Sequence, residues 1–519
     1  MAFPVPSRAV LRPLAAAVAL ALVSLLLVDP APAYDPWAWL LWGREVAGGG
    51  LSTVDGPAFK PLPVAVCAVL APLGSAAPWL WVLLVRVAAV LAAWLAYGLG
   101  RRLAGGSPAA GALAAVGVLL CGGLLTYSAT GAEPALVVAL ALGGAAAWRA
   151  ERFRVALACG VGCALLRVEA WPFLLVAGIV LWRRRPQDRA VLASLALLVP
   201  AAWLVPELLG SGDLLRSGAR ARVPNPGQPA LDDSPGLAAL EAALRLPLWP
   251  LWAGVAALAV RAAAPARSTV APDAAGAPRA ALAPAAAGAA WIGIVALMAE
   301  AGFSGEPRYA VPGAALIAIS GAVGLALAAR VIGESARSRR PAPALAARAI
   351  GERGRSSRAP ALAARAIGEP GRSRRPAPAL AAAVALVVLA AAPRVADLPA
   401  LRSEQAYQWR LAGDLAEAVR AAGGREAVLA CGRPYVGPLR GPLMAYRLGV
   451  AKHVVEPDDP PRAPGVVFRS ALSAAASPAP PAPPRFAETA RAGAWQVLAS
   501  CGAAMTSGAA TPAFANGGQ

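Results

Sequence analysis

Long apolar stretches alternate with short polar segments over most of the 519-residue chain. Clusters of arginine follow every second stretch, as they do on the cytoplasmic side of membrane proteins. The pattern predicts a mainly α-helical, polytopic membrane protein with about eleven spans and a cytoplasmic N-terminus. The predicted spans include residues 14–28, 79–99, 109–125, 155–166, 171–182, 244–260, 283–298, 311–329 and 379–392, with a fourth ending at Arg149 and a seventh at Leu209.

The first apolar stretch has two interpretations. It ends in Ala31-Pro32-Ala33, which has the small residues of a signal-peptidase site. We favour an uncleaved first span, because spans continue throughout the chain. Asp35 emerges on the outer face in either case.

Composition supports the membrane interpretation and excludes other classes. Hydrophobic residues make up 58% of the chain and the mean hydropathy is +0.58, which is too apolar for a soluble globular protein. The net charge of +20 does not indicate nucleic-acid binding, because the basic residues lie in short clusters between apolar stretches. The expected location is the plasma membrane, with multiple spans.

The same pattern divides the chain into five regions. Residues 1–329 form the transmembrane core, and 330–376 contain an Arg/Pro/Ala-rich repeat that we expect to be a disordered cytoplasmic insertion. The last span lies within 377–395. Residues 396–502 are expected to form a small extracytoplasmic α/β domain, and 503–519 a flexible tail.

The C-terminal region carries its own predictions. It alternates between a helical stretch at 405–422 and strand-like stretches at 427–431 and 465–468. If this region lies outside the cytoplasm, Cys431 and Cys501 are able to form a disulfide. The four other cysteines lie in apolar stretches and are expected to be buried, not metal ligands. The only histidine, His453, is expected to be a surface residue.

The segment after the first span begins with Asp35-Pro36, a pair that favours the start of a helix. Trp37, Trp39 and Trp42 follow, and tryptophan anchors helices at the lipid–water boundary. We therefore expect a short helix lying along the bilayer surface. Lys60 lies at the end of the loop that follows this helix.

Apart from the arginine clusters, nine charged residues flagged near the span ends all fall on the outer face. Ionisable groups at membrane depth are costly and tend to mark sites or pathways, although any outer loop also needs some charges. Structural roles remain open too: helix capping for Asp35, interfacial anchoring for Arg308 and a helix-dipole interaction for Glu133. The residues are Asp35, Glu45, Lys60, Glu133, Arg167, Glu169, Asp213, Glu306 and Arg308.

A site with acidic residues beside cationic ones is suited to an enzyme that transfers a group away from a phosphate leaving group. A carboxylate can accept the proton of an acceptor hydroxyl, while lysine or arginine stabilises the departing phosphate. Nucleotide-linked donors are cytoplasmic, so an outward-facing site is expected to use a donor linked to a lipid phosphate. The sequence contains no phosphate-binding glycine loop, nucleophile elbow or histidine-rich metal motif.

These motifs together resemble the GT-C superfamily of polytopic glycosyltransferases. The resemblance is to bacterial relatives of the protein mannosyltransferases and of the enzymes that glycosylate lipid A and cell-wall glycans. It covers about residues 10–330 and departs from the usual pattern in lacking a paired acid beside Asp35. The motifs are Asp35-Pro36-Trp37, Gly56 to Pro63, Thr130 to Glu133, Arg167 to Pro172 and Pro307 to Tyr309.

The resemblance implies an inverting glycosyltransferase whose residues 1–329 are the catalytic core. Asp35 would be the catalytic base in transfer from a polyprenyl-phosphate sugar to an extracytoplasmic acceptor on a glycan, lipid or protein. Lys60 and Arg308 would bind the lipid phosphate. The remaining substrate-binding residues would be Glu133, Arg167, Glu169 and Tyr309. No cofactor is expected, although the question of whether the outer acids bind a divalent ion stays open.

Two other classes of function remain open. A transporter or flippase for a lipid-linked or anionic substrate would favour two related halves with polar residues at the membrane midplane. The sequence shows no such symmetry, and its charges lie at one face. A structural membrane protein is the third alternative.

Overall fold

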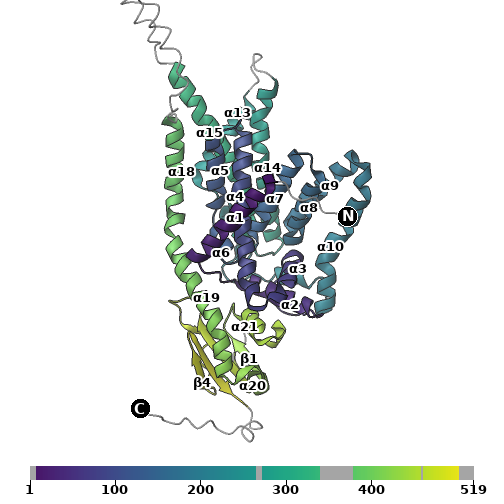
Figure 1. Cartoon of the computed structure of the whole chain (residues 1–519), viewed down its shortest axis with the longest axis vertical. Helices are drawn as coiled ribbons and strands as arrows, with labels where there is room; N and C mark the ends of the chain where they lie inside the picture. The colour runs from purple at the N-terminus through teal and green to yellow at the C-terminus, as the bar shows by residue number, and fades with distance from the viewer. Residues whose placement is uncertain (1–7, 265–271, 339–377, 457–459, 502–519) are drawn as a thin grey trace, which may run out of the picture.

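The computed structural model describes residues 8–264, 272–338, 378–456 and 460–501. These residues form a bundle of helices with a small mixed sheet at one end (Figure 1). The polytopic helical fold with a small C-terminal α/β unit is thus confirmed. The helices of the first half are α1 (Arg8–Leu27), α2 (Tyr34–Ala47), α3 (Pro61–Leu70), α4 (Ala77–Leu103), α5 (Pro108–Leu119), α6 (Leu124–Ala129), α7 (Pro134–Arg149), α8 (Phe153–Leu166), α9 (Trp171–Arg184), α10 (Arg189–Ser211) and α11 (Arg216–Ala221).

The second half of the described chain adds further helices, and short 3₁₀ turns connect several of them. The helices are α12 (Pro235–Leu244), α13 (Trp249–Ala263), α14 (Pro272–Glu300), α15 (Pro307–Ser338), α18 (Pro378–Ala396), α19 (Leu398–Ala421), α20 (Gly424–Cys431) and α21 (Gly441–Leu448). The 3₁₀ turns are η1 (Ala71–Ala76), η2 (Val168–Ala170), η3 (Pro186–Asp188), η4 (Pro229–Leu231) and η6 (Lys452–Val454).

Helices occupy all of the predicted spans, but they differ in length. By length and hydropathy, five helical stretches among the described residues are suited to crossing a membrane, or six if the bent pair α12 and α13 forms one span. The other predicted spans coincide with shorter helices, so the count of about eleven spans stays a prediction. The five stretches are Pro61–Leu103, Pro186–Ser211, Pro278–Glu300, Pro307–Gly333 and Pro378–Ala421.

Two predicted spans are broken in the structure. The eighth, 244–260, begins at the last residue of α12 and otherwise coincides mostly with α13, and the two helices meet at 94°. Pro247 lies in the break and lacks the N–H that a continuous helix would need. The third ends at Leu119, and Gly123 at φ +77° separates it from α6. Glycine adopts that left-handed conformation without a steric penalty.

The predicted insertion at 330–376 also starts differently in the structure. Helix α15 continues to Ser338, so residues 330–338 belong to a helix and not to a disordered segment. Alanine and arginine are good helix formers and extend it beyond the apolar stretch. The rest of the predicted insertion and the predicted tail at 503–519 lie outside the described residues.

The sheet of the C-terminal unit has the strand order β1-β2-β5-β4, with β3 paired to β2. Strand β2 runs parallel to β1 and antiparallel to β5. Residues 427–431, predicted as a strand, belong to helix α20, because the run Glu426 to Ala430 consists mostly of helix-forming residues. The strands are β1 (Arg433–Val436), β2 (Gly465–Ala471), β3 (Pro478–Ala479), β4 (Ala487–Ala492) and β5 (Trp495–Ser500).

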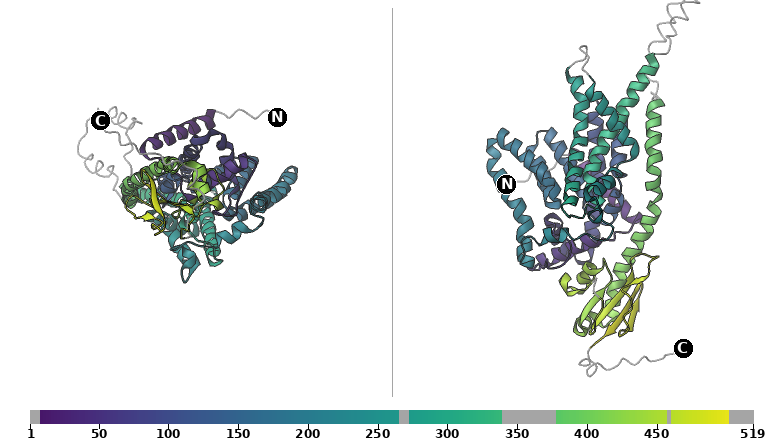
Figure 2. Two further views of the ribbon diagram at one scale, coloured as in Figure 1. Left: turned by 90° about the horizontal axis from the view of Figure 1, so that it is seen from below. Right: turned by 180° about the vertical axis from the view of Figure 1, so that it is seen from behind.

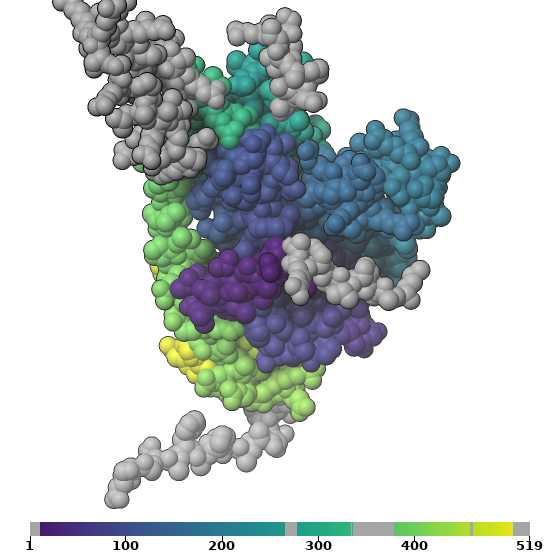
Figure 3. All heavy atoms as spheres, turned by 45° about the horizontal axis from the view of Figure 1, so that its top comes forward, coloured from purple at the N-terminus to yellow at the C-terminus, as the bar shows by residue number. Residues whose placement is uncertain are grey.

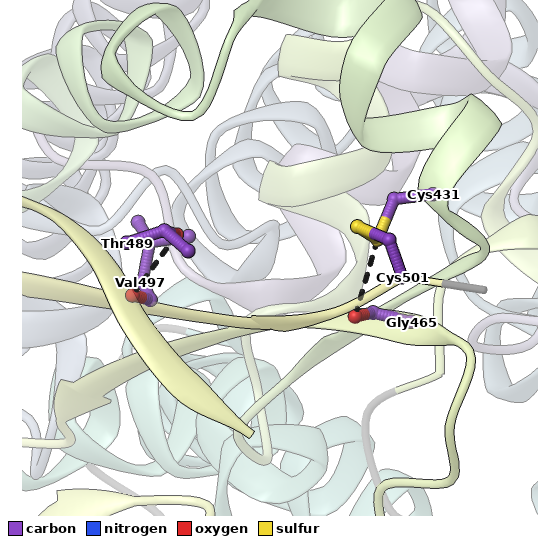
Figure 4. The surroundings of a disulfide bond; sticks show 5 residues. All are labelled: Cys431, Gly465, Thr489, Val497 and Cys501. Carbon is purple, nitrogen blue, oxygen red and sulfur yellow. Dashed lines mark hydrogen bonds between the residues drawn. A yellow bond between two sulfur atoms is a disulfide. The ribbon is translucent and has the colours of Figure 1, made fainter. Parts of the chain in front are cut away.

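A disulfide joins Cys431 and Cys501, the pair that the sequence allowed if this region lies outside the cytoplasm (Figure 4). It connects the end of α20 to the residue that follows β5, and the sulfur of Cys431 lies 3.6 Å from the carbonyl oxygen of Gly465 at the start of β2. The disulfide therefore links helix α20 to the end of strand β5 in the sheet. His453 is exposed, as expected.

The C-terminal unit packs against the end of the bundle that contains α2 and α3. Helix α18 runs along the bundle and leads into α19, which reaches the sheet (Figures 1 and 2). Helix α21 lies against α2. In Figure 3 the green and yellow C-terminal region lies directly beside the purple and blue N-terminal region.

This packing overturns the expected surface role of the tryptophans in α2. Trp39 and Trp42 are fully buried and Trp37 is only 5% exposed. Trp37 packs against Tyr446 of α21, and Trp39 meets Trp81 edge to face with ring centroids 5.6 Å apart. They are core residues, because the C-terminal unit and α4 cover the helix that the sequence alone left at the bilayer surface.

Candidate functional site

Asp35 lies in the first turn of α2. The helix begins at Tyr34 after Ala33, and no side chain caps it, so Asp35 is not its N-cap. The backbone N–H of Ala33 donates to Thr130 O at 2.9 Å, which fixes the start of α2 beside the turn that precedes α7. The Asp35 carboxylate is 9% exposed and faces Arg308.

Arg308 holds two carboxylates at the start of α15. Its Nη1 lies 3.0 Å from Asp35 Oδ2, and its Nε pairs with Glu306. Gln228 donates to the other oxygen of Glu306. The planar guanidinium suits this double pairing better than a lysine ammonium, because its donors form a rigid fork.

A second group of charges centres on Glu133, which is 1% exposed. Its Oε1 pairs with Lys60 and lies 3.2 Å from Arg167 Nη1. Arg167 also forms a two-point pair with Glu169, in which Nε donates to Oε2 at 3.0 Å. Two buried cations thus share two buried carboxylates.

Tyr309 joins the two groups. The Arg167 guanidinium lies 3.6 Å from the centroid of its ring and that of Arg308 lies 5.1 Å from it. Trp291 donates to the backbone oxygen of Tyr309 at 2.7 Å and fixes this position on α15. We call the combined set the charge cluster: Asp35, Lys60, Glu133, Arg167, Glu169, Glu306, Arg308 and Tyr309.

All seven residues predicted for the site are therefore brought together. The helices α2, α3, α7 and α15 each begin at the cluster, at Tyr34, Pro61, Pro134 and Pro307. Helix N-termini carry partial positive charge and free backbone N–H groups, so their convergence favours an anion. Glu45 and Asp213, two other flagged acids, stay apart and accept from nearby backbone N–H groups.

The electrostatics keep Glu133 charged. Burial alone would raise the pKa of its carboxyl, but Lys60, Arg308 and Arg167 outweigh burial and hold that pKa well below its usual range. The carboxylate in turn compensates cations that would otherwise be buried without a partner.

Two cavities adjoin the cluster on different sides. One, of about 240 Å³, is mostly apolar and reaches Lys60, Arg167, Glu169 and Tyr309. The other, of about 450 Å³, reaches Arg308 and has a more polar lining of Thr126, Thr130, Gln228 and Glu306.

An apolar groove of about 830 Å³ lies between α9 and α10. Trp171 lines both this groove and the apolar cavity beside Lys60. The groove and the cavity beside Lys60 therefore adjoin at Trp171.

Sequence reasoning missed the residues that hold the Lys60 loop. Arg216 donates to the carbonyls of Gly56 and Pro57, and Ser217 accepts from Phe59 N at 2.7 Å. Buried Glu207 accepts from Ser217 and lies 3.6 Å from Arg216. A lone acid inside the apolar stretch of α10 was the signal that could have found this group.

Within the described residues, no three His, Cys, Asp or Glu side chains are grouped so that they could hold a metal ion. The carboxylates of the cluster face arginine or lysine.

No protein-family model and no curated protein matches the sequence. Two solved structures of ArnT from Cupriavidus metallidurans are similar to the chain, and each comparison covers 94% of this chain and 97% of that one. The apo structure has a TM-score of 0.51 at 16% identity, and the structure bound to undecaprenyl phosphate has 0.46 at 15%. The chain therefore has the fold of ArnT as the apo structure shows it.

Proposed function

We propose that the chain is a membrane glycosyltransferase that moves a sugar from a polyprenyl-phosphate donor to a hydroxyl on an extracytoplasmic acceptor. One observation carries the proposal. Acids and cations from four helix N-termini and η2 meet between an apolar cavity and a polar one. This arrangement matches a donor that is partly lipid and an acceptor that arrives from water.

The donor occupies the apolar side. Its isoprenoid chain lies in the groove between α9 and α10 and enters the cavity beside Trp171. Its phosphate binds Lys60, Arg167 and Arg308, assisted by the N-termini of the surrounding helices. A second, anionic ligand for Arg308 weakens the pair between Arg308 and Asp35 and releases the carboxylate.

The reaction is a single displacement. The carboxylate of Asp35 accepts the proton of the acceptor hydroxyl as its oxygen forms a bond to the anomeric carbon. The bond between that carbon and the phosphate oxygen breaks, and its electron pair leaves with the polyprenyl phosphate. The cations stabilise the charge that develops on that phosphate, and the configuration of the sugar inverts.

The sugar lies between the two cavities. Glu133 Oε2 is buried and has no hydrogen-bond partner among the described residues, so it is available to a sugar hydroxyl. The acceptor enters through the polar cavity at Thr130 and Gln228. A hexose or a pentose satisfies these contacts, so the proposal extends to both.

The test uses purified protein in lipid vesicles with a panel of radiolabelled polyprenyl-phosphate sugars and acceptors. Wild type should transfer the label, and Asp35→Asn should lower the rate by about a hundredfold or more, because general base catalysis contributes about that factor. Donor binding should persist in Asp35→Asn.

Asp188→Asn is the matched control. Asp188 is also buried and paired with arginines, Arg154 and Arg185, but it lies outside the charge cluster. It should transfer at the wild-type rate. Equal rates for wild type and Asp35→Asn would remove Asp35 from the chemistry. Donor translocation without covalent product would instead support the transporter or flippase alternative.

A further inference from the structure

The only two lysines of the chain act on the same loop. Lys60 ends the loop between α2 and α3, and Lys452 lies in η6 of the C-terminal unit. Lys452 is 3% exposed and pairs with Asp55 of that loop. A buried ammonium needs a partner, so this pair ties the C-terminal unit to the loop.

Neighbouring contacts support the same attachment. His453 Nδ1 lies 3.1 Å from Ser52 Oγ, and Arg44 of α2 donates to Tyr446 O of α21 at 2.6 Å. Trp42 donates to Ser52 O at 2.9 Å. The beginning of the loop is therefore held between α2 and the C-terminal unit.

The connection from Asp55 to Lys60 is short and constrained. Gly56 follows with φ +117°, and a side chain there would meet Trp42 at 2.9 Å. Arg216 and Ser217 hold the backbone of residues 56–59 from the opposite side. Asp55 is thus joined to the start of α3 by a short stretch of held backbone, and Lys60 at that start faces Glu133.

We infer that Lys452 is a positioning residue, through which the C-terminal unit holds the Lys60 loop in the conformation that binds the donor phosphate. The inference rests on the proposed function. Lys452 touches no reacting atom; it acts through Asp55 on Lys60. The C-terminal unit is thus part of the donor site and not only a covering domain.

The experiment compares Lys452→Met with wild type in the reconstituted protein. Methionine keeps the apolar stem and removes the charge. We expect the KM for the donor to rise about tenfold with little change in kcat, because an interaction used in donor binding is weakened. We also expect faster hydrogen–deuterium exchange in residues 51–60.

Two further variants separate positioning from general loss of structure. Lys452→Arg should restore most of the donor affinity, since it restores the charge. Asp55→Asn should reproduce the effect of Lys452→Met, and the double variant should be no worse than either one, because both remove the same interaction.

Arg433→Met is the matched control, because Arg433 of β1 forms its ion pair with Glu456 and does not touch the loop. It should change neither KM nor exchange. The inference would be overturned if Lys452→Met kept the wild-type KM for the donor and the wild-type rate of hydrogen–deuterium exchange in residues 51–60. If wild type transferred no sugar from any donor, the proposed function would fail, and exchange in residues 51–60 would still decide the inference. If Lys452→Met did not fold, Asp55→Asn would decide it alone.

Discussion

Glu133 is the residue on which the balance of buried charge in the cluster depends. It faces Lys60 and Arg167, two cations that are each less than one-tenth exposed. Removing one partner of a buried pair costs about 3–5 kcal/mol, because the remaining charge is left uncompensated. We therefore expect Glu133→Gln to lower stability and donor binding together.

The lowered pKa of Glu133 predicts how stability depends on pH. A carboxyl whose pKa is depressed on folding contributes stability above its unfolded value, near 4.5, and that contribution is lost as pH falls toward the folded pKa. Wild type should lose thermal stability below about pH 4.5 more steeply than Glu133→Gln. Inactivation temperatures measured from pH 7 to pH 3 check this.

Glu241→Gln is the control for that comparison. Glu241 forms an exposed pair with Arg245 at 3.7 Å, and exposed pairs contribute little. Its pH profile should match that of wild type. Parallel profiles for wild type and Glu133→Gln would contradict the role assigned to Glu133.

The sequence was a good guide to which residues lie together in the charge cluster and a poor guide to their partners. Asp35, Lys60, Glu133, Arg167 and Arg308 stand out because charges at the ends of apolar stretches are costly and need a reason. Their pairing depends on how helices distant in sequence pack together. The sequence therefore suggested a helix cap for Asp35, whereas the structure gives it a partner 273 positions later, Arg308.

At the scale of elements, glycines allow α13 and α15 to approach each other closely. A side-chain carbon built on Gly254 would lie 1.9 Å from Gly321 O, and one on Gly324 would lie 1.9 Å from Gly254 O. Only glycine permits this approach. Gly254→Ala should force the helices apart and destabilise the protein by about 1–3 kcal/mol, as overpacking does.

Gly293→Ala in α14 provides the matched comparison. Among the described residues, no heavy atom beyond its chain neighbours and the adjacent backbone of α14 lies within 4 Å of a side-chain carbon built there. Alanine is about 1 kcal/mol better than glycine inside a helix, so this variant should be neutral or more stable. Thermal inactivation of both variants checks the pair of predictions. Equal behaviour would show that the contact between α13 and α15 is not tight.

Predictions of elements succeeded where long apolar stretches decide the structure and failed where tertiary packing or local helix propensity decides it. Each predicted span is helical, because long apolar stretches leave few alternatives. The tryptophans of α2 were misplaced, since only the packed C-terminal unit covers them. Residues 427–431 were predicted as a strand, but local helix propensity prevailed in α20.

For the whole molecule, the important relation is that the charge cluster and the C-terminal unit lie at the same end of the bundle. Helices α2 and α3 contribute to the cluster, and α2 also contacts α21 of the C-terminal unit. The disulfide between Cys431 and Cys501 belongs to that unit, and disulfides persist in oxidising compartments. The disulfide favours the extracytoplasmic side for the C-terminal unit, and the cluster at the same end would then share that side; this orientation stays a prediction.

Labelling with a membrane-impermeant maleimide tests this orientation. Ser477→Cys places an exposed thiol in the C-terminal unit, and Ala150→Cys places one after α7, whose N-terminus is at the cluster. In intact cells, Ser477→Cys should be labelled and Ala150→Cys should be labelled only after permeabilisation. Wild type is the background control, because Cys67, Cys121 and Cys163 are buried as expected, whereas Cys159 is only partly buried and sets the background labelling.

The orientation also decides which donor the site can use. If the C-terminal unit faces outward, the cluster is separated from cytoplasmic nucleotide sugars, and a donor already carried across the membrane by its lipid is required. The apolar groove, which adjoins the cavity beside Lys60 at Trp171, would then hold the lipid chain of that donor. The reverse labelling pattern would place the cluster beside soluble activated sugars and remove the reason for a lipid-linked donor, even though the contacts within the cluster would be unchanged.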